Sequence, residues 1–380
     1  MSELEDGNAV ITAARAVEAI ARQNARDVDR IGRFPSEAIE VARRHRLLSY
    51  LLRCDEIGPA ELRTILRATR IISGGCASTA MIFAMHQAQV LVLRQHAGSP
   101  LWQRISSIRE QDLLLASATS ERGTGGDISV SVCFAEQHET HVRVEKDCPI
   151  VSYGEYADAI LLTARASQEA APNQQVLIFC DTKRALLRRT TEWDTLGMRG
   201  TCSHGYQVRA TVPPEAVYPH PYSQIAAETE VAASHLMWSG VWLGIATESV
   251  ATAVAYLRSN GRDLSPRYAT KKDLMLSAAK RRLNDMETVI DGAIIKYCEQ
   301  GGQLGRRTVE FNHLKLSASE YVCEIVDQCL QIIGLAAYYS DGKYSLARLI
   351  RDARSAPIMI SNDRLEVNNS LIARSRLGLG

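Results

Sequence analysis

The chain has almost no net charge and no long run of one sign. Its 380 residues carry 44 Lys and Arg against 43 Asp and Glu, a formal net charge of +1. Proteins that bind nucleic acid concentrate positive charge on one face or segment, so we expect no nucleic-acid partner. With 46% hydrophobic and 23% charged residues, the composition is that of an ordinary globular protein with two or three domains.

Cysteine pairs of the kind that bind zinc are also missing. The nine cysteines are odd in number and none stands in a Cys-x-x-Cys pair. This pattern argues against a disulfide framework and a structural zinc, and it fits a reducing cytosol. His138 and His141 have a ligand-like spacing, but a turn between strands fits them better because no carboxylate or cysteine partner stands nearby. We therefore expect no metal. Since the acidic N-terminus lacks the apolar core of a signal peptide, we expect a cytoplasmic protein.

No apolar run is long enough for a clear membrane span. The best candidate, residues 231–247, is shorter than about 20 residues and lies between Glu230 and Glu248. Gly240 and Gly244 within it have the spacing of a close helix crossing. We expect a buried helix here and no membrane association.

The periodicity of the chain changes twice. Residues 1–112 have apolar side chains at helical spacing and predict an N-terminal domain of about five helices. Residues 113–222 alternate in β-branched segments and predict a small all-β domain. Residues 223–380 are again helical and predict a four-helix bundle. The segments that carry these predictions are strands at 130–132, 141–144, 159–163, 176–179 and 205–212, and long helices at 228–260, 269–300, 307–333 and 345–374.

The centre of the chain is a glycine-rich stretch, residues 193–208. Its glycines at 197, 200 and 205 let the backbone pass close to something flat or bulky before a strand resumes at Tyr206. The string Leu-Gly-Met-Arg-Gly-Thr at 196–201, followed by a short strand, resembles the mid-domain segment of the acyl-CoA dehydrogenase family. The α-β-α order of domains resembles that family over nearly the whole chain. The resemblance implies an α+β multidomain fold: an N-terminal helical domain, a central β-barrel-like domain and a C-terminal four-helix bundle. It also implies a homodimer or homotetramer that binds FAD, with FMN or transiently bound reduced flavin as alternatives.

Two segments resemble the family's contacts to the flavin ring. Residues 118–127 are similar to its Thr-Glu-Pro-x-Ala-Gly-Ser-Asp turn, which places Ser120 and Gly126 at the cofactor. A glycine-rich turn of this kind can present main-chain N–H groups to an acceptor. Residues 146–154 are similar to Lys-x-Trp-Ile-Thr-Asn-Gly, with a two-residue insertion and with Ile150 in place of the tryptophan. The resemblance makes Ser152 the second flavin-contacting hydroxyl.

Two further segments resemble the family's contacts to the adenosine half of FAD on a neighbouring subunit. Residues 331–338 are similar to Gln-x-x-Gly-Gly-x-Gly-Tyr, which implicates Gln331 and Gly334, although two glycines are replaced. Arg258, in Arg-Ser-Asn-Gly at 258–261, stands near the place of the arginine that pairs with the pyrophosphate. Residues 351–354 keep the family's Arg-Asp-Ala-Arg string. The ring pocket is better preserved than the adenosine pocket.

The usual catalytic carboxylate is absent. Members of this family use a glutamate to remove the α-proton of an acyl thioester, and its two known places fall on Ile360 and Ser234. Asp363 and Glu230 lie within a helical turn of these places, and His235 is next to Ser234. In the apolar segment 80–92, His86 is the only strongly polar residue besides two glutamines. A buried structural histidine is the commoner explanation for such a residue.

Three functions follow. The first is α,β-dehydrogenation of an acyl thioester, carried by coenzyme A or a carrier protein, with Asp363, Glu230 or His235 as the base; the family resemblance favours it. The second is a monooxygenase of the same fold that receives reduced flavin from a flavin reductase, reacts with O₂, and places His86 and Ser152 near the flavin. The third is a flavin-fold binding protein without turnover.

Overall fold

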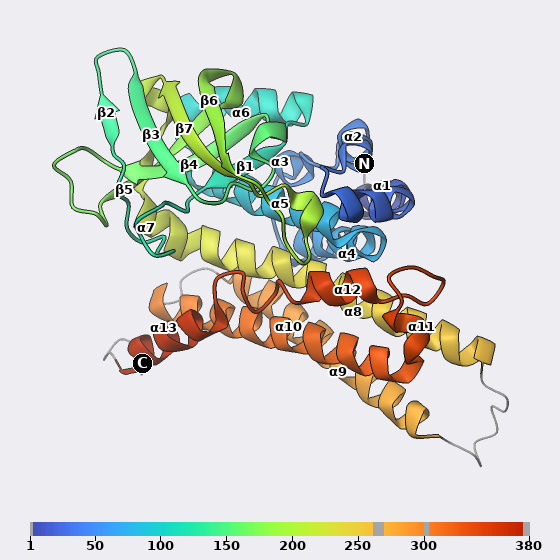
Figure 1. Ribbon diagram of the computed structural model, residues 1–380. Helices are drawn as coiled ribbons and strands as arrows, with labels where there is room; N and C mark the ends of the chain where they lie inside the picture. Colours follow the sequence, from blue (N-terminus) through green and yellow to red (C-terminus); the bar gives the residue numbers. More distant parts are fainter. Residues whose placement is uncertain (1–2, 261–269, 300–303, 375–380) are drawn as a thin grey trace.

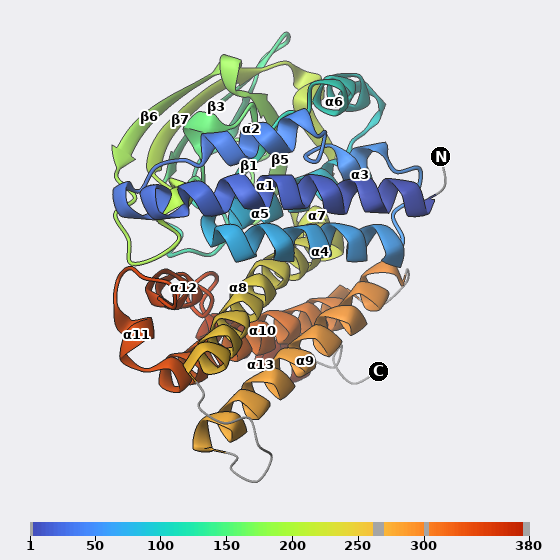
Figure 2. The same cartoon turned by 90° about the vertical axis from the view of Figure 1, so that its right-hand side faces the viewer.

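The N-terminal region is helical, as expected. The computed structural model describes residues 3–260, 270–299 and 304–374. Val10, Ala14, Val17 and Ala21 form a buried stripe on the first helix, which packs against the fourth (Figure 2). The helices of this region are α1 (Glu3–Ile31), α2 (Ser36–Arg44), α3 (Tyr50–Arg53), α4 (Pro59–Gly75), α5 (Ala77–His96) and α6 (Ser99–Gln111).

The central region consists of two four-stranded sheets. One has the order β1-β4-β5-β8 and the other β2-β3-β7-β6. Only the pair β1 and β4 is parallel among the named strand pairs of the described residues, so the sheets are not of the doubly wound parallel type. The strands are β1 (Leu115–Ala118), β2 (Ala135–Gln137), β3 (Val142–Cys148), β4 (Ala159–Arg165), β5 (Gln175–Asp181), β6 (Ala185–Thr191), β7 (Gly205–Val212) and β8 (Val217–Pro221).

The strand predicted at residues 130–132 was wrong. This segment is irregular because its main chain bonds a carboxylate instead of a neighbouring strand. Glu121 accepts hydrogen bonds from the N–H groups of Val132, at 3.1 Å, and Cys133, at 2.6 Å. The histidine pair does form a turn between strands, with His138 N–H donating to the carbonyl of His141.

The C-terminal region is a helical bundle in which two shorter helices, α12 and α13, replace the fourth long helix. The helix predicted over 345–374 is wrong, because the chain turns between α12 and α13, at Pro357 and at Ile360, whose φ is +45°. Gly334 ends α10 with a φ of +76°, as its position predicts. Gly261 and the residues around position 301 lie outside the described residues. The elements are α7 (Tyr222–Ile225), the π-turn η5 (Ala226–Glu230), α8 (Val231–Asn260), α9 (Lys271–Cys298), α10 (Leu304–Ile333), α11 (Leu335–Tyr338), α12 (Ala347–Ala353) and α13 (Asn362–Arg374).

Helix α8 is the central helix of the molecule. It contacts α4, α5, α9 and α10, and Figure 1 shows it between the sheets and the rest of the bundle. A Cβ on Gly244 would stand 2.6 Å from the carbonyl oxygen of Arg70, so the predicted close helix crossing is present. By length and composition the segment Tyr222–Asn260 meets the criteria for a membrane span, but more than half of its most apolar window is buried inside the protein. A buried core helix meets the same criteria.

The glycine-rich stretch 193–208 joins the sheets to the helices. A Cβ on Gly197 would stand 2.2 Å from the carbonyl oxygen of Arg351 in α12, and one on Gly200 would stand 2.3 Å from Val28 in α1. The glycines therefore allow contact with other segments of the chain itself. This stretch fixes the position of the central region relative to both helical regions.

Candidate functional site

Ser120 and Ser152 lie on neighbouring turns of the central region. The Ser120 hydroxyl donates a hydrogen bond of 2.8 Å to the carbonyl of Ile150, two residues before Ser152. The side chain of Ile150 is 46% exposed. An exposed apolar side chain between two hydroxyl-bearing residues offers one apolar face and a polar edge. The two turns that resemble the flavin-ring contacts therefore lie side by side.

Ser152 is the outer end of a chain of hydroxyl groups. Its Oγ lies 2.9 Å from Ser203 Oγ, which lies 2.8 Å from Thr201 Oγ1. Thr201 donates its proton to the carbonyl of Met198 at 2.9 Å. Sequence reasoning missed Ser203 and Thr201, although both belong to the glycine-rich stretch already singled out. Their burial behind the partly exposed Ser152 makes this edge of the site polar to some depth.

The glycine-rich turn that contains Gly126 is fastened to the bundle. Gly123, Gly125 and Gly126 all have positive φ, and no atom lies within 4 Å of a Cβ placed on Gly125. Arg364, the third residue of α13, donates to the carbonyl of Gly125 at 2.7 Å and also to that of Gly126. The turn thus lies between the central region and the start of α13.

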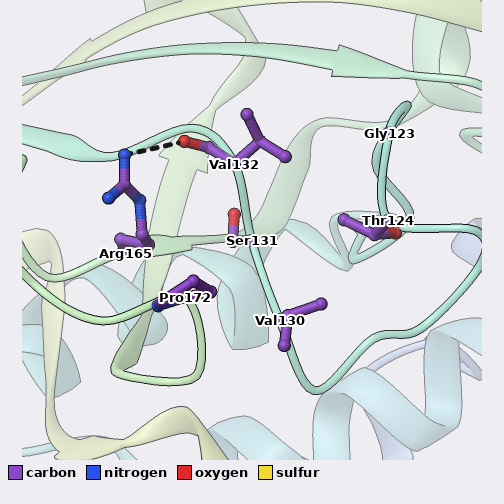
Figure 3. Close-up of a pocket in the computed structure, with 7 residues that line it drawn as sticks. All are labelled: Gly123, Thr124, Val130, Ser131, Val132, Arg165 and Pro172. Atoms are coloured by element: carbon purple, nitrogen blue, oxygen red, sulfur yellow. Dashed lines mark hydrogen bonds between the residues drawn. The ribbon is translucent and has the colours of Figure 1, made fainter.

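A hollow of about 370 Å³ lies beside this turn (Figure 3). Arg165 crosses one side of it, donating from Nη2 to the carbonyl of Val132 at 3.0 Å, while its buried Nε has no partner among the described residues. The rest of the lining is mainly apolar, from Val130, Val132 and Pro172. The hollow combines an apolar wall with one guanidinium edge.

Ile360, at one of the two expected base positions, lies next to a cation. The carbonyl of Ile360 accepts a hydrogen bond of 2.9 Å from Nζ of Lys315 in α10, and the same Nζ donates to Asn362 Oδ1 at 2.6 Å. Burial lowers the pKa of Lys315 to about 8. Sequence reasoning missed this lysine; the signal was a charged residue between Leu314 and Leu316 in an apolar helix face. The site near Ile360 is therefore positively charged.

Asp363 and His235, the two other candidate bases, differ in their burial. Asp363 is exposed at the start of α13. His235, in α8, is buried, and its Nδ1 donates to the carbonyl of Phe311 at 3.0 Å, which leaves the lone pair of Nε2 without a partner among the described residues. Burial lowers its pKa to about 4, so the ring is neutral at pH 7.

His86 has no nitrogen left for chemistry. Its Nδ1 accepts a hydrogen bond from the N–H of Leu115 at 3.0 Å, so Nε2 carries the proton and donates to the carbonyl of Leu48 at 2.8 Å. Burial lowers its pKa to about 4. The geometry is that of a structural link between α5, β1 and the segment before α3, and it does not support the role beside a flavin.

Glu230 is a buried carboxylate on the segment that leads into α8. It ends the π-turn η5, is 8% exposed, and its Oε2 has no well-formed hydrogen bond in the described part of the chain. Burial raises its pKa to about 7, while Tyr222 and Gln89, which lie beside it, oppose that rise. The positive charge of Lys146 also reaches it, and Lys146 Nζ donates to the carbonyl of Thr119 at 3.4 Å. Glu230 is therefore within electrostatic reach of Lys146, whose amine contacts the segment that carries Ser120.

The residues expected to hold the adenosine half lie elsewhere. Arg258 is in the last turn of α8, and Gln331 and Gly334 are at the end of α10. These helix ends lie near α11, on the side of the bundle remote from the sheets (Figure 1). Arg258 and Gln331 are exposed. A single chain does not bring them together with Ser120 and Ser152, and no group of metal-binding residues occurs among residues 3–260, 270–299 and 304–374.

The chain resembles known proteins in sequence and in structure. Residues 225–375 match the family model "Acyl-CoA dehydrogenase, C-terminal domain". No curated protein matches the sequence. FMN-bound TdsC from Paenibacillus sp. A11-2 aligns with a TM-score of 0.81 and 20% identity over 95% of this chain and 96% of its own. KijD3 in complex with dTDP aligns with a TM-score of 0.80 and 20% identity over 97% and 96%.

Butyryl-CoA dehydrogenase from Megasphaera elsdenii aligns with a TM-score of 0.82 and 16% identity over 97% of this chain and 98% of its own. At these identities the structural matches establish the fold, and both dehydrogenases and monooxygenases have it; another TdsC structure is titled dibenzothiophene monooxygenase. The expected helical–β–helical architecture is confirmed. The chain thus has the acyl-CoA dehydrogenase fold, and its residues 225–375 match the C-terminal domain of that family.

Proposed function

We propose that this protein is a flavin-dependent oxidoreductase that dehydrogenates an acyl thioester between its α and β carbons, with Glu230 as the base. The observation that carries the proposal is the Glu230 carboxyl group: it is buried, its Oε2 has no partner among the described residues, and its pKa is raised to about 7 by burial. A general base is most effective when its pKa lies near the working pH. Glu230 stands one helical turn before Ser234, one of the family's two base positions.

The central region fits the flavin ring system. Ile150 offers an exposed apolar face, Ser120 and Ser152 offer hydroxyl groups, and the glycine-rich turn offers main-chain N–H groups. When bound, a flavin accepts the hydride of such a reaction. TdsC and KijD3, each known in a complex with FMN, share the fold, so both FAD and FMN are candidates.

The chain's own residues divide the remaining work. Glu230 takes the proton from the α carbon, and Tyr222 and Gln89 beside it favour its charged form. Lys146, whose side chain is 0% exposed, lies 4.0 Å from the buried carboxylate of Glu121 beside Ser120, so these two charges offset each other. The hollow lined by Val130, Val132 and Pro172 is a candidate place for the carrier portion of the thioester.

The test is anaerobic reduction of the protein's bound flavin by acyl-CoA thioesters of several chain lengths. Glu230→Gln should slow the bleaching of the flavin by about a hundredfold or more while leaving the flavin bound. Glu228→Gln, two residues earlier in the same π-turn, is the matched control and should react normally. Asp363→Asn and His235→Asn test the other candidate bases. If Glu230→Gln reacts at the parent rate while Asp363→Asn does not, Asp363 is the base.

A monooxygenase of the same fold is the second candidate. Two observations favour it: the family's glutamate is missing at both Ile360 and Ser234, and a chain of hydroxyl groups lies behind Ser152. The reaction of reduced flavin with O₂ needs no carboxylate base. Such an enzyme would take reduced flavin from a flavin reductase. Two results would favour a monooxygenase over a dehydrogenase. The parent protein would bind reduced FMN and take up O₂, both unchanged in Glu230→Gln, and no acyl thioester would reduce its flavin. A protein that binds flavin but does neither would be the non-catalytic alternative.

We also propose a homodimer or homotetramer in the cytoplasm. The contributing observation is a set of exposed apolar side chains on the bundle, since large exposed apolar residues often mark an interface. They are Leu335, Tyr338, Tyr339, Val367 and Leu371. In an oligomer, Arg258, Gln331 and Gly334 would be available to a flavin on a neighbouring subunit. A monomer by light scattering at micromolar concentration would contradict this assembly.

A further inference from the structure

Lys315 is a buried cation that the proposed reaction does not use. The whole residue is 0% exposed, and the acceptors of its amine come from the end of the turn between α12 and α13 and from the first residue of α13. A buried charge is stabilised only when it is well hydrogen-bonded. The two acceptors, the carbonyl of Ile360 and Oδ1 of Asn362, are therefore held firmly against α10.

The turn held by Lys315 is strained. Ile360 has a φ of +45°, a conformation that is unfavourable for a β-branched residue and persists only where its surroundings enforce it. Asn362 Nδ2 also donates to Ser319 Oγ at 3.1 Å, so α10 holds the turn at two points. Without these bonds we expect residue 360 to relax to negative φ and the first turn of α13 to move.

The first turn of α13 carries the contact to the glycine-rich turn. Arg364 stands two residues after Asn362 and donates to the carbonyls of Gly125 and Gly126. Farther along the helix, Asn312 of α10 donates to Asn369 at 2.7 Å, so the rest of α13 is fastened independently. Lys315 therefore controls chiefly the end of α13 that reaches the site.

We propose that Lys315 is a positioning residue, which holds the turn before α13 and thereby seats Arg364 on the carbonyl groups of Gly125 and Gly126. The inference depends on the proposed function only in taking the glycine-rich turn as part of the flavin and thioester site. Its effect is to keep that turn in one conformation, with the carbonyl groups of Gly125 and Gly126 bonded to Arg364.

The seating should depend on pH, because a neutral amine is a weaker donor than an ammonium group. Burial brings the pKa of Lys315 to about 8. The other groups around it are His235 of α8, which is neutral above pH 6.5, Ser319 of α10, and Asp363 and Arg364 of α13. Lys315 is therefore expected to lose its charge between pH 7 and 9.

Hydrogen exchange followed by mass spectrometry tests the inference on the full-length protein without substrate. Lys315→Met should raise exchange about tenfold or more in both residues 358–366 and residues 123–127. Arg364→Gln should raise it in residues 123–127 alone, because the turn before α13 keeps its own bonds. Lys296→Met, which removes a lysine from a partly exposed ion pair between α9 and α10, is the control and should change neither segment.

The pH series separates positioning from general stability. After correction for intrinsic exchange, the parent protein should lose protection in both segments between pH 7 and 9, whereas Lys315→Arg should not. Unchanged protection of residues 123–127 in Lys315→Met would overturn the proposal. Should Lys315→Met fail to fold, the parent pH series and Arg364→Gln decide it alone. None of these measurements depends on turnover. The role of Lys315 can therefore be disproved while the proposed reaction stands, and the proposed reaction can be disproved while the role of Lys315 stands.

Discussion

Oδ1 of Asp352 accepts a hydrogen bond of 2.7 Å from the main-chain N–H of Met198, a residue 154 positions earlier in the chain. Asp352 is buried in α12, and Met198 lies in the glycine-rich stretch between β6 and β7. The next residue of that stretch, Arg199, donates from Nε to the carbonyl of Asp29 in α1 at 2.7 Å. These bonds join the three regions of the chain at one point.

Removing the Asp352 carboxylate should loosen this junction. Asp352→Ala leaves the buried N–H of Met198 without a partner, which should lower the free energy of unfolding by about 1–3 kcal/mol. Asp352→Asn keeps an acceptor and should be much milder. Urea denaturation of both variants at pH 7 measures the difference. Equal loss in the two variants would mean that charge, not the hydrogen bond, is what matters.

The contribution of Asp352 to stability should decrease with rising pH, the opposite of the usual behaviour of an ion-paired carboxylate. Burial raises the pKa of Asp352 to about 6, from an ordinary value of 3.8. The folded state therefore binds the proton more tightly than the unfolded state, and this group's contribution to stability falls as the pH rises from about 4 to 6. Asp352→Asn lacks this titration, so its stability relative to the parent should increase across that window.

Two glycines of similar sequence context should respond very differently to alanine. Gly197→Ala places a Cβ 2.2 Å from the carbonyl oxygen of Arg351, where only main chain can move, and should lower the free energy of unfolding by about 3 kcal/mol or more. Gly125→Ala meets no neighbouring atom and carries only the cost of a positive φ, about 1 kcal/mol. Thermal denaturation followed by circular dichroism ranks them; the reverse order would contradict the contact between the stretch and α12.

The two buried histidines should make the protein sensitive to acid. Burial lowers the pKa of both His86 and His235 to about 4, from 6.5. The unfolded state binds these protons more readily, so stability should fall as the pH drops from about 6.5 to 4, by up to about 3 kcal/mol for each histidine. His235→Asn should remove its share of that slope. Asp352 and Glu230 contribute the opposite slope over part of this range, so the comparison of the variant with the parent is the test. A stability difference between His235→Asn and the parent that is the same at pH 5 and pH 7 would contradict the burial of this ring.

The architecture could be predicted from the sequence because it depends on periodicity. The apolar stripe of α1 and the alternation of β7 are repeated over many residues, and each repeat strengthens the pattern. The errors lie where a single side chain decides the backbone. Glu121 draws residues 132 and 133 out of a strand by bonding their N–H groups, and Lys315 stabilises the break before α13. Both partners are distant in sequence, so local patterns could not show them.

The candidate site was only partly predictable for the same reason. Ser120, Gly126 and Ser152 lie in short segments whose resemblance to a family survives as strings of residues. His86 was singled out by type alone, and its two main-chain partners, Leu48 and Leu115, become visible only once the helices are packed. Glu230 and Asp363 were equivalent in the sequence. Their burial separates them, because one is enclosed by α5 and α7 and the other faces solvent.

Glu230 should show a conflict between stability and activity. Burial raises its pKa to about 7 from 4.5, so this carboxyl group's contribution to stability is lost as the pH rises from about 4.5 to 7. Glu230→Gln has no such loss and should therefore be more stable than the parent at pH 8, by up to about 3 kcal/mol, and similar to it at pH 4.5. Urea denaturation at the two pH values measures this, with Glu228→Gln as the control that should show no pH-dependent difference. If the stabilised Glu230→Gln protein still binds flavin yet is no longer reduced by a thioester that reduces the parent, the buried charge is retained for catalysis at the expense of stability. A variant less stable than the parent at pH 8 would instead make Glu230 a structural residue, and would remove the main support for dehydrogenation.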